Sequence, residues 1–465
     1  MRGLPGRDRP PLILDASGSA AHLVSRRRAW GTALAVVALA MTDYIDRQIV
    51  VSTFPYLKRA WGLPDTALGA LVTIVSVTIA LCALPAARLA DRWGRVKTIA
   101  AMGSVWSLAT LACAVCGNYA QLLGARALLG AGEAGYGPAG AALLSGYFPQ
   151  RLRATVLSIF QAAGPLGSVL GVVLGGVMIG QFGWRVTLGA FGVPGLLLAL
   201  LFLTVRDYRT PAVSDAGGTD AEGDTGERLT PDRAASRRPG PVATLRELFR
   251  PRTAVWCYLG GALNLVVLST LYTWLPSYLS RTYGLSSAQA GAKASLFILA
   301  GFVGAIVFGH LADRLGDGCP RRRLTVPAVL AACALVLLFT AFAVLGPGAG
   351  QYALIVAAGL AVAAALGTAP AAVVDVVHPS MRATAVGMVT LVQNLFGLAV
   401  GPVFTGLLSD VFGLGTALAV MPLCCLAAAA AFRHGSRSYE KDLAAVSGGG
   451  PAVTPPGSQV RELSQ

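Results

Sequence analysis

Five ionisable side chains stand inside two long apolar segments of the 465-residue chain. Asp43, Asp46 and Arg47 lie in the first segment, and Arg126 and Glu133 lie in the fourth. Placing a charge in the hydrocarbon layer of a membrane costs roughly 2.5–3.5 kcal/mol on insertion scales, so such residues are rare and usually face a cavity or one another. Carboxylates and guanidinium groups held in this way can take up protons and can pair with an anion.

The spacing of these residues predicts that Asp46 and Arg126 lie at matching depth in the membrane. A helix rises about 1.5 Å per residue, so Asp46 lies roughly 9 Å from the C-terminal end of the first segment and Arg126 roughly 9 Å from the N-terminal end of the fourth, and these two ends are at the same membrane face. Arg126 and Glu133 are seven positions apart and therefore share a helical face. We expect a ladder of acid, base and acid, in which Asp46 and Glu133 compete for Arg126 and Asp43 lies one turn below Asp46.

Such a ladder can couple a proton to an anion. A buried carboxylate holds its proton more tightly, whereas a neighbouring cation weakens that hold. A deprotonated carboxylate would pair with Arg126, and a protonated one would release Arg126 to attract an anionic head group. The alternative is a static pair that joins the two helices. Arg47 is about 100° around the helix from Asp46, so we expect it either to bind substrate or to extend toward the membrane surface.

The composition requires these segments to be membrane helices. Hydrophobic residues make up 55% of the chain and charged residues 13%, against about 25% charged residues in a soluble domain. Lipid offers backbone groups no other partner, so we predict an all-α membrane protein. At about 20 apolar residues per crossing, the sequence contains twelve transmembrane segments, at 30–52, 66–88, 98–117, 120–145, 154–180, 184–205, 253–279, 289–311, 324–345, 350–376, 384–410 and 412–433.

The basic residues predict how these segments are oriented. Lys and Arg are frequent in the N-terminal tail and in the gaps after the second, fourth and eighth segments, and they are sparse in the alternate gaps. Because Lys and Arg favour the cytoplasmic side, both termini are expected in the cytoplasm of a multi-pass protein of the inner (plasma) membrane. The net charge of +15 is thereby assigned to topology, and nucleic-acid binding is excluded.

The charges also divide the chain into five parts. The stretch between the sixth and seventh segments is rich in Asp, Glu, Arg, Gly, Pro and Ser, which is typical of a flexible linker. Leu245–Arg252 is expected to form a short interfacial helix at its end. The predicted parts are an N-terminal tail (1–29), a six-helix bundle (30–205), a cytoplasmic linker (206–252), a second six-helix bundle (253–433) and a disordered tail (434–465).

The two predicted bundles repeat one another. Ala90-Asp91-Arg92-Trp93-Gly94 recurs 222 positions later as Ala312-Asp313-Arg314-Leu315-Gly316, and Gly69 recurs at the same offset as Gly291. Arg153-Ala154-Thr155 recurs as Arg382-Ala383-Thr384. Three matches in the same order indicate duplication. Two six-helix halves related by an axis along the membrane normal are the arrangement of the major facilitator fold.

The loop after the second segment resembles the signature loop of the major facilitator superfamily, with the sequence Ala87-x-Leu89-Ala90-Asp91-Arg92-x-Gly94-Arg95-Val96-Lys97. The resemblance implies that this loop is a gate latch that stabilises the outward-open state. The gating residues would be Asp91, Arg92, Arg95, Asp313 and Arg314. The alternative is a tight turn whose charges only mark topology.

A narrower resemblance is to the spinster-like branch, which includes lysophospholipid and sphingolipid transporters. It lies in Tyr44-Ile45-Asp46-Arg47-Gln48 and in Arg126-x3-Gly130-x-Gly132-Glu133-Ala134-Gly135-Tyr136. The resemblance implies that Asp46, Arg47, Arg126 and Glu133 carry the coupling. Asp43 stands where relatives often have Asn, which leaves the number of titrating carboxylates open.

We therefore expect a secondary active transporter that moves an amphiphilic, lysophospholipid-like anion together with protons. Proton coupling is assigned to Asp46, Glu133 and Asp43. Substrate binding is assigned to Arg126, Arg47, Tyr136 and Asn264, with the apolar tail of the substrate against the second half, which is poor in buried charge.

Three other functions stay open. They are transport of small organic anions or sugar phosphates, efflux of apolar cations, and a non-transporting receptor on the same fold. No GxxxxGK[ST] nucleotide loop occurs, and the eight cysteines lie mostly in apolar segments, where packing is their expected role. We expect a monomer in the lipid bilayer, with no enzymatic activity, cofactor or metal.

Overall fold

The computed structural model describes residues 26–205, 241–378 and 381–447, and these ranges are almost wholly helical. The prediction of an all-α protein is confirmed, and helices occupy each of the twelve predicted segments. Within the described ranges, nine stretches are long and apolar enough to cross a membrane. The number of twelve crossings and the cytoplasmic location of the termini stay predictions.

In the first half, the helices depart from the predicted segments at one place, because the predicted segment 120–145 is interrupted at Ala134 and Gly135. Gly183, with a φ of 74°, makes a kink within α6 at the predicted gap between 154–180 and 184–205. The elements are α1 (Arg26–Trp61), α2 (Asp65–Trp93), α3 (Arg95–Val115), α4 (Tyr119–Glu133), α5 (Tyr136–Tyr147), α6 (Gln150–Ala190), α7 (Gly192–Leu201) and η1 (Phe202–Thr204).

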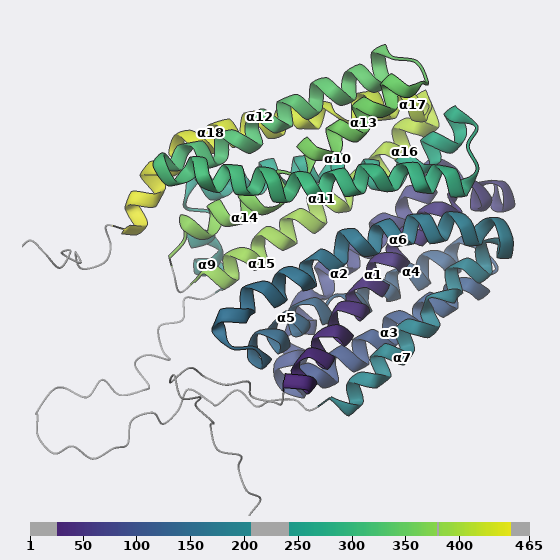
Figure 1. Ribbon diagram of the computed structural model, residues 1–465, viewed down its shortest axis with the longest axis horizontal. Coiled ribbons are helices and arrows are strands. Elements are labelled where there is room, and N and C mark those ends of the chain that lie inside the picture. The colour runs from purple at the N-terminus through teal and green to yellow at the C-terminus, as the bar shows by residue number, and fades with distance from the viewer. Residues whose placement is uncertain (1–25, 206–240, 379–380, 448–465) are drawn as a thin grey trace, which may run out of the picture. The chain divides into compact units, whose positions relative to one another are not determined.

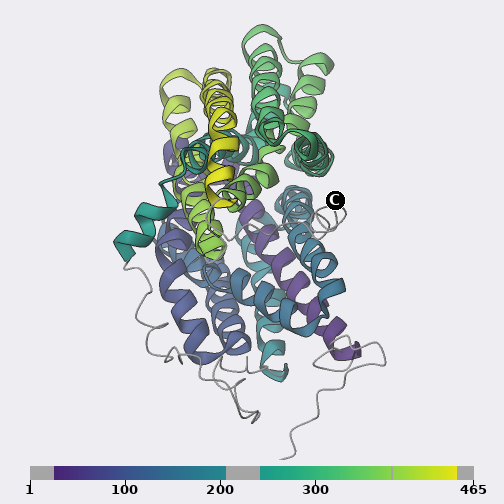
Figure 2. The ribbon, with the colours of Figure 1, turned by 90° about the vertical axis from the view of Figure 1, so that its left-hand side faces the viewer.

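The second half begins with α9, a short helix that a turn joins to α10 and that overlaps the helix predicted at 245–252 (Figure 2). Two π-helical stretches, η2 and η4, interrupt its later segments. The elements are α9 (Pro241–Leu248), α10 (Arg252–Tyr283), α11 (Ser287–Gly318), α12 (Pro320–Phe339), η2 (Thr340–Val344), α13 (Ala349–Val362), α14 (Ala365–Asp375), α15 (Arg382–Val392), η4 (Gln393–Leu398), α16 (Val400–Phe412), α17 (Leu414–Val420) and α18 (Leu423–Ser447).

The last helix continues further than the sequence indicated. The predicted disordered tail begins at residue 434, but α18 remains helical to Ser447. Two polar side chains explain the difference, because each ties the end of α18 to another helix. The buried Tyr439 donates a hydrogen bond to Asp375 at 2.5 Å, and Asp442 accepts one from the backbone N–H of Thr253 at 2.8 Å.

The described residues form two compact units. Unit 1 contains the helices of 26–205 together with 269–299 and 399–417, and unit 2 contains 241–268, the described part of 300–398, and 418–447. This division differs from the two predicted bundles. Parts of α10, α11 and α16 pack with first-half helices inside unit 1, through contacts described below.

In unit 1, small residues let helices approach closely. Helix α1 lies along α6 (Figure 1). A Cβ atom added at Gly167 would lie 2.7 Å from the carbonyl oxygen of Met41, and one added at Gly171 would lie 2.7 Å from that of Ile45. These glycines therefore let α1 and α6 pack tightly, as small residues spaced four apart do in membrane helices.

The repeated glycines Gly69 and Gly291 make matching contacts in unit 1. A Cβ atom at Gly69 would collide with the carbonyl group of Pro402, where α2 packs on α16. One at Gly291 would lie 2.5 Å from the carbonyl oxygen of Val172, where α11 packs on α6. The α2–α16 contact is reinforced by a hydrogen bond of 2.6 Å from Thr73 Oγ1 to the carbonyl of Ala399.

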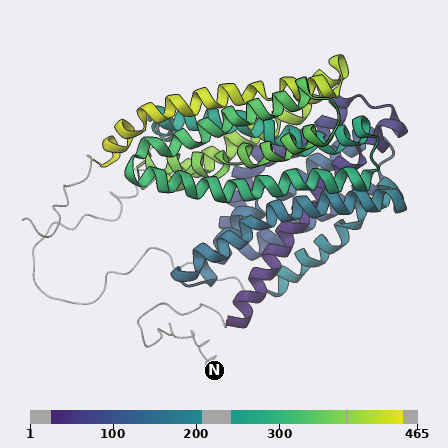
Figure 3. The same cartoon turned by 45° about the horizontal axis from the view of Figure 1, so that its top comes forward.

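Unit 2 has its own core. Helices α12 and α18 lie side by side (Figures 1 and 3). The buried Phe432 of α18 and Tyr258 of α10 belong to an apolar cluster to which Ala372 and Val373 of α14 also contribute.

We expect Gly171→Ala to destabilise the protein by about 1–3 kcal/mol, the usual cost of overpacking. The added methyl group would meet backbone atoms of α1, which can yield only if the two helices separate. The thermal midpoint of the purified protein in detergent measures the effect. Gly180→Ala in the same helix is the matched control, because a Cβ there meets nothing within 4 Å. Equal midpoints for the two variants would contradict the packing argument.

Candidate functional site

Three helices of unit 1 bring four of the predicted site residues together. Arg47 on α1 lies between two carboxylates: its Nη2 is 2.6 Å from Oε2 of Glu133 on α4, and its Nε is 3.3 Å from Oδ1 of Asp43 on α1. The hydroxyl of Tyr136 on α5 donates a hydrogen bond of 2.7 Å to the other oxygen of Asp43. Arg47 is therefore the shared partner of both acids.

Burial separates the cation of this cluster from its acids. The side chain of Asp43 is 1% exposed and that of Glu133 is 0% exposed, whereas the side chain of Arg47 is 24% exposed. Its guanidinium also lies over the ring of Tyr44, at 5.4 Å from the centroid. The cluster therefore buries both carboxylates almost completely and leaves part of the Arg47 side chain exposed.

The predicted pairing of Arg126 with a carboxylate is not the arrangement that the structure has. Arg126 is buried and its Nε donates a hydrogen bond of 3.2 Å to the carbonyl oxygen of Leu71 on α2, but no ion pair in the described part of the chain includes it. Glu133 pairs with Arg47 instead. A long arginine side chain explains the difference, because it can reach a neighbouring helix even when its Cα faces elsewhere.

Asp46 has a partner that the sequence did not reveal. Thr110, buried on α3, donates a hydrogen bond of 2.8 Å from its hydroxyl to Oδ2 of Asp46. A threonine inside an apolar segment gives no indication of which acid it will meet. Asp46 therefore lies against α3, apart from the ion pairs of Arg47.

The close packing of α4 against its neighbours depends on two glycines. A Cβ atom at Gly130 would collide with α2 at Thr78, and one at Gly132 would lie 2.7 Å from the backbone nitrogen of Trp106 on α3. These glycines let α4 pack closely against both neighbours. The break after Glu133 then starts α5 at Tyr136, whose ring packs 5.1 Å from that of Trp106.

Asn264, the predicted substrate ligand of the second half, lies in unit 2. Its Nδ2 donates a hydrogen bond of 2.5 Å to the carbonyl oxygen of Val362, so its amide joins α10 to α13. The amide thus forms an interhelical hydrogen bond within unit 2.

The predicted gate loop is a one-residue turn between α2 and α3. Gly94 has a φ of 90°, and its carbonyl accepts a hydrogen bond of 2.8 Å from Thr98 Oγ1. A residue with a side chain would be strained there. Arg92 is exposed and Arg95 is half-buried; the side chain of Asp91 lies outside the described residues.

The second copy of this loop is held by an arginine that sequence analysis did not single out. In unit 2, Arg323 Nη2 lies 2.7 Å from Asp313 and its Nη1 lies 2.5 Å from Asp375, which also accepts the hydroxyl of Tyr439. The ends of α11, α12, α14 and α18 are thereby joined. Arg314 is exposed.

At the other end of α2, unit 1 contains a charged cluster that sequence analysis missed. The buried Asp65 accepts two hydrogen bonds from Arg281 on α10, at 2.6 and 2.8 Å, one from Lys58 on α1 at 2.7 Å and one from Ser409 on α16 at 2.6 Å. In the sequence, Lys58 and Arg281 appear only among the few basic residues between predicted segments. No local pattern could show that an acid 216 positions away would bind Arg281.

A second carboxylate reinforces this junction. Asp410 of α16 accepts hydrogen bonds from the backbone N–H groups of Asp65 and Thr66, at 2.7 and 2.8 Å, and from the hydroxyl of Thr66 at 2.6 Å. Helix α2 has no side-chain cap of its own, so α16 supplies the anion that its N-terminus favours.

Comparison with known proteins identifies relatives along most of the chain. The family model described as "Major Facilitator Superfamily" matches residues 36–397 and 279–462. The chain is 29% identical over 416 residues to an MFS-type efflux pump of Mycolicibacterium smegmatis, covering 86% of this chain and 89% of the relative. It is 32% identical over 319 residues to a gallate transporter of Pseudomonas putida, covering 64% and 68% respectively.

The fold is also similar to a solved structure. An inward-facing, unoccupied bacterial homologue of the human lysosomal transporter Spinster superposes with a TM-score of 0.75. The two chains are 23% identical, and the match covers 90% of this chain and 99% of the other. At this identity, the similarity shows the fold.

We expect Asp65→Asn to destabilise the protein by roughly 3 kcal/mol, the lower end of the cost of breaking a buried ion pair, because its partner Arg281 is partly exposed. A double-mutant cycle of Asp65→Asn with Arg281→Gln, read from thermal melting in detergent, should give a coupling of about 2–3 kcal/mol. The exposed Arg59 provides the control, as Asp65→Asn with Arg59→Gln should be additive. Additivity in both cycles would show that Asp65 and Arg281 do not stabilise one another.

Proposed function

The chain belongs to the Major Facilitator Superfamily, and we propose that it is a proton-coupled carrier of organic carboxylate anions. The observation that carries the proposal is the position of Arg47 between Asp43 and Glu133. A partly exposed guanidinium beside buried acids offers a bidentate site for one carboxylate of a substrate. The substrate can bind there only when protonation of Asp43 or Glu133 breaks the ion pair of that acid with Arg47.

The coupling follows from charge balance. While Glu133 is ionised, it neutralises Arg47 and the cluster has little attraction for a second anion. A proton that enters with the substrate neutralises Glu133, and the substrate carboxylate takes its place on the guanidinium. Asp43, which Tyr136 and Arg47 both contact, and Asp46, held by Thr110, are the other candidate proton carriers.

Carboxylates are favoured over the other substrate classes for two reasons. The gallate transporter, which is 32% identical to this chain, carries the name of an aromatic carboxylate. Efflux of apolar cations is disfavoured because the exposed charge of the cluster is positive. An amphiphilic, lysophospholipid-like anion is the second candidate, supported by the spinster-like motifs around Asp46 and Glu133 and requiring the same cation.

Alternating access requires contacts that form at one end and break at the other. We assign the junction of Asp65, Arg281 and Asp410 to the gate at the α1–α2 end of unit 1. The loop of Asp91, Arg92 and Arg95, and Asp313 and Arg314 in the second copy, are assigned to the opposite gate. Arg126 then joins α4 to α2 within unit 1, and Asn264 joins α10 to α13 within unit 2.

We expect Arg47→Gln to lower kcat/KM for gallate uptake about tenfold to a hundredfold, since a hydrogen bond to a charged group contributes about 1.5–3 kcal/mol. Uptake is measured in proteoliposomes of the purified full chain, with Arg59→Gln as the control on the same helix. Gallate, a lysophosphatidylglycerol and tetraphenylphosphonium are compared by thermal stabilisation of the unmodified protein. Stabilisation by the lysolipid alone would favour the second candidate, and by the cation alone would refute both.

We expect Glu133→Gln to abolish proton-driven accumulation while exchange of labelled for unlabelled substrate continues. The amide mimics the protonated acid, so Arg47 remains free to bind the anion, but no proton can be released. Both modes are measured in the same proteoliposomes, with and without an imposed pH gradient. Full retention of accumulation would remove Glu133 from the coupling mechanism.

A further inference from the structure

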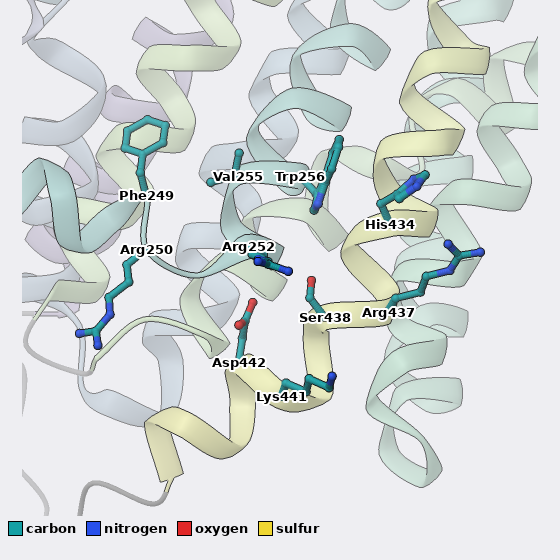
Figure 4. Close-up of a pocket in the computed structure, with 10 residues that line it drawn as sticks. All are labelled: Phe249, Arg250, Arg252, Val255, Trp256, His434, Arg437, Ser438, Lys441 and Asp442. Carbon is teal, nitrogen blue, oxygen red and sulfur yellow. The ribbon is translucent and has the colours of Figure 1, made fainter.

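Unit 2 contains a large cavity that the transport mechanism does not use. It has a volume of about 810 Å³, within the range of roughly 300–1,000 Å³ that is common for small-molecule sites. Its walls come from the segment that joins α9 to α10, the first turns of α10 and the final helix α18 (Figure 4). It lies at the end of these helices that the positive-inside rule assigns to the cytoplasm.

The cavity is strongly basic. Arg250, Arg252, Arg437 and Lys441 line it, against the single acid Asp442. That acid already accepts a hydrogen bond of 2.8 Å from the backbone N–H of Thr253 at the start of α10.

Few acids elsewhere offset this charge. Arg250 lies 3.6 Å from Glu247. Arg252, Arg437 and Lys441 take part in no ion pair among the described residues. The cavity therefore presents several cations that lack an anion.

Aromatic and aliphatic groups flank the basic residues. The ring of Trp256 packs on that of His434, with centroids 5.2 Å apart and planes inclined by 32°. Val255, which lines the cavity, and Leu259, one turn further along α10, are 37% and 46% exposed. Tryptophan is enriched at the level of lipid headgroups, and exposed aliphatic residues beyond it continue into the hydrocarbon layer.

We propose that this cavity binds the headgroup of an anionic phospholipid from the surrounding bilayer. Arg252, Arg437 and Lys441 bind the phosphate oxygens, Trp256 lies against the glycerol region, and the acyl chains follow Val255 and Leu259 along α10. Basic pockets between helices on the cytoplasmic side are suited to such headgroups. The combination of unpaired cations with an adjoining apolar face fits a lipid better than free phosphate, which would use only the cations.

The test is native mass spectrometry of the full chain, purified in detergent and mixed with equal amounts of cardiolipin, phosphatidylglycerol or phosphatidylcholine. We expect the two anionic lipids to be retained at least tenfold more than phosphatidylcholine. The variant Arg252→Gln/Arg437→Gln/Lys441→Gln should lose that preference. The control variant Arg321→Gln/Arg322→Gln/Arg433→Gln removes the same charge from exposed positions of unit 2 outside the cavity and should keep it.

Three results would overturn the proposal. One is equal retention of phosphatidylcholine and the anionic lipids by the unmodified protein, and another is an equal loss of preference in the two triple variants. The third concerns the thermal midpoint of the purified protein. If inorganic phosphate or glycerol phosphate raises it as much as phosphatidylglycerol does, the cavity would be assigned to a soluble anion. If the triple variant does not fold, the single variant Arg437→Gln, at an exposed position of α18, replaces it. It should lower the retention of the anionic lipids about threefold.

Discussion

The neutralisation of buried charge is the constraint on which the arrangement of unit 1 depends. Two acids with almost no exposure, Asp43 and Glu133, share the guanidinium of Arg47, and leaving either of them without a partner would cost several kcal/mol. The ion pair of Arg47 with Glu133 joins α1 to α4. Gly130 and Gly132, whose missing side chains let α4 approach α2 and α3, lie in the same helix as Glu133.

The same constraint links chemistry to motion. A cluster of two acids and one base carries a net negative charge when both acids are ionised, and it approaches neutrality when it holds one proton. Binding of an anionic substrate to the singly protonated cluster makes its net charge negative again. In the mechanism we propose, proton and substrate bind together because the cluster tolerates little excess charge of either sign.

Much of the fold could be predicted from the sequence, whereas the partners of the charged residues could not. Apolar segments about 20 residues long locate the helices, and the intramembrane charges point to α1 and α4. Helical geometry favoured Arg126 as the partner of Glu133, but the flexible side chain of Arg47 reaches that acid instead. Asp65 binds residues from three other helices, far apart in the chain. The helical course of residues 434–447 depends on tertiary contacts of Tyr439 and Asp442, which composition does not reveal.

The duplicated glycines have a mechanical consequence. At Gly69 and Gly291, the helix backbone has no side chain and packs directly against a backbone carbonyl group of another helix, that of Pro402 and that of Val172 respectively. Helices that interlock through large side chains must change several rotamers before they can shift, since packed cores resist continuous deformation. A surface without side chains presents fewer such rotamer changes. The predicted sequence repeat thus corresponds to one close, side-chain-free crossing in each half, at Gly69 and at Gly291.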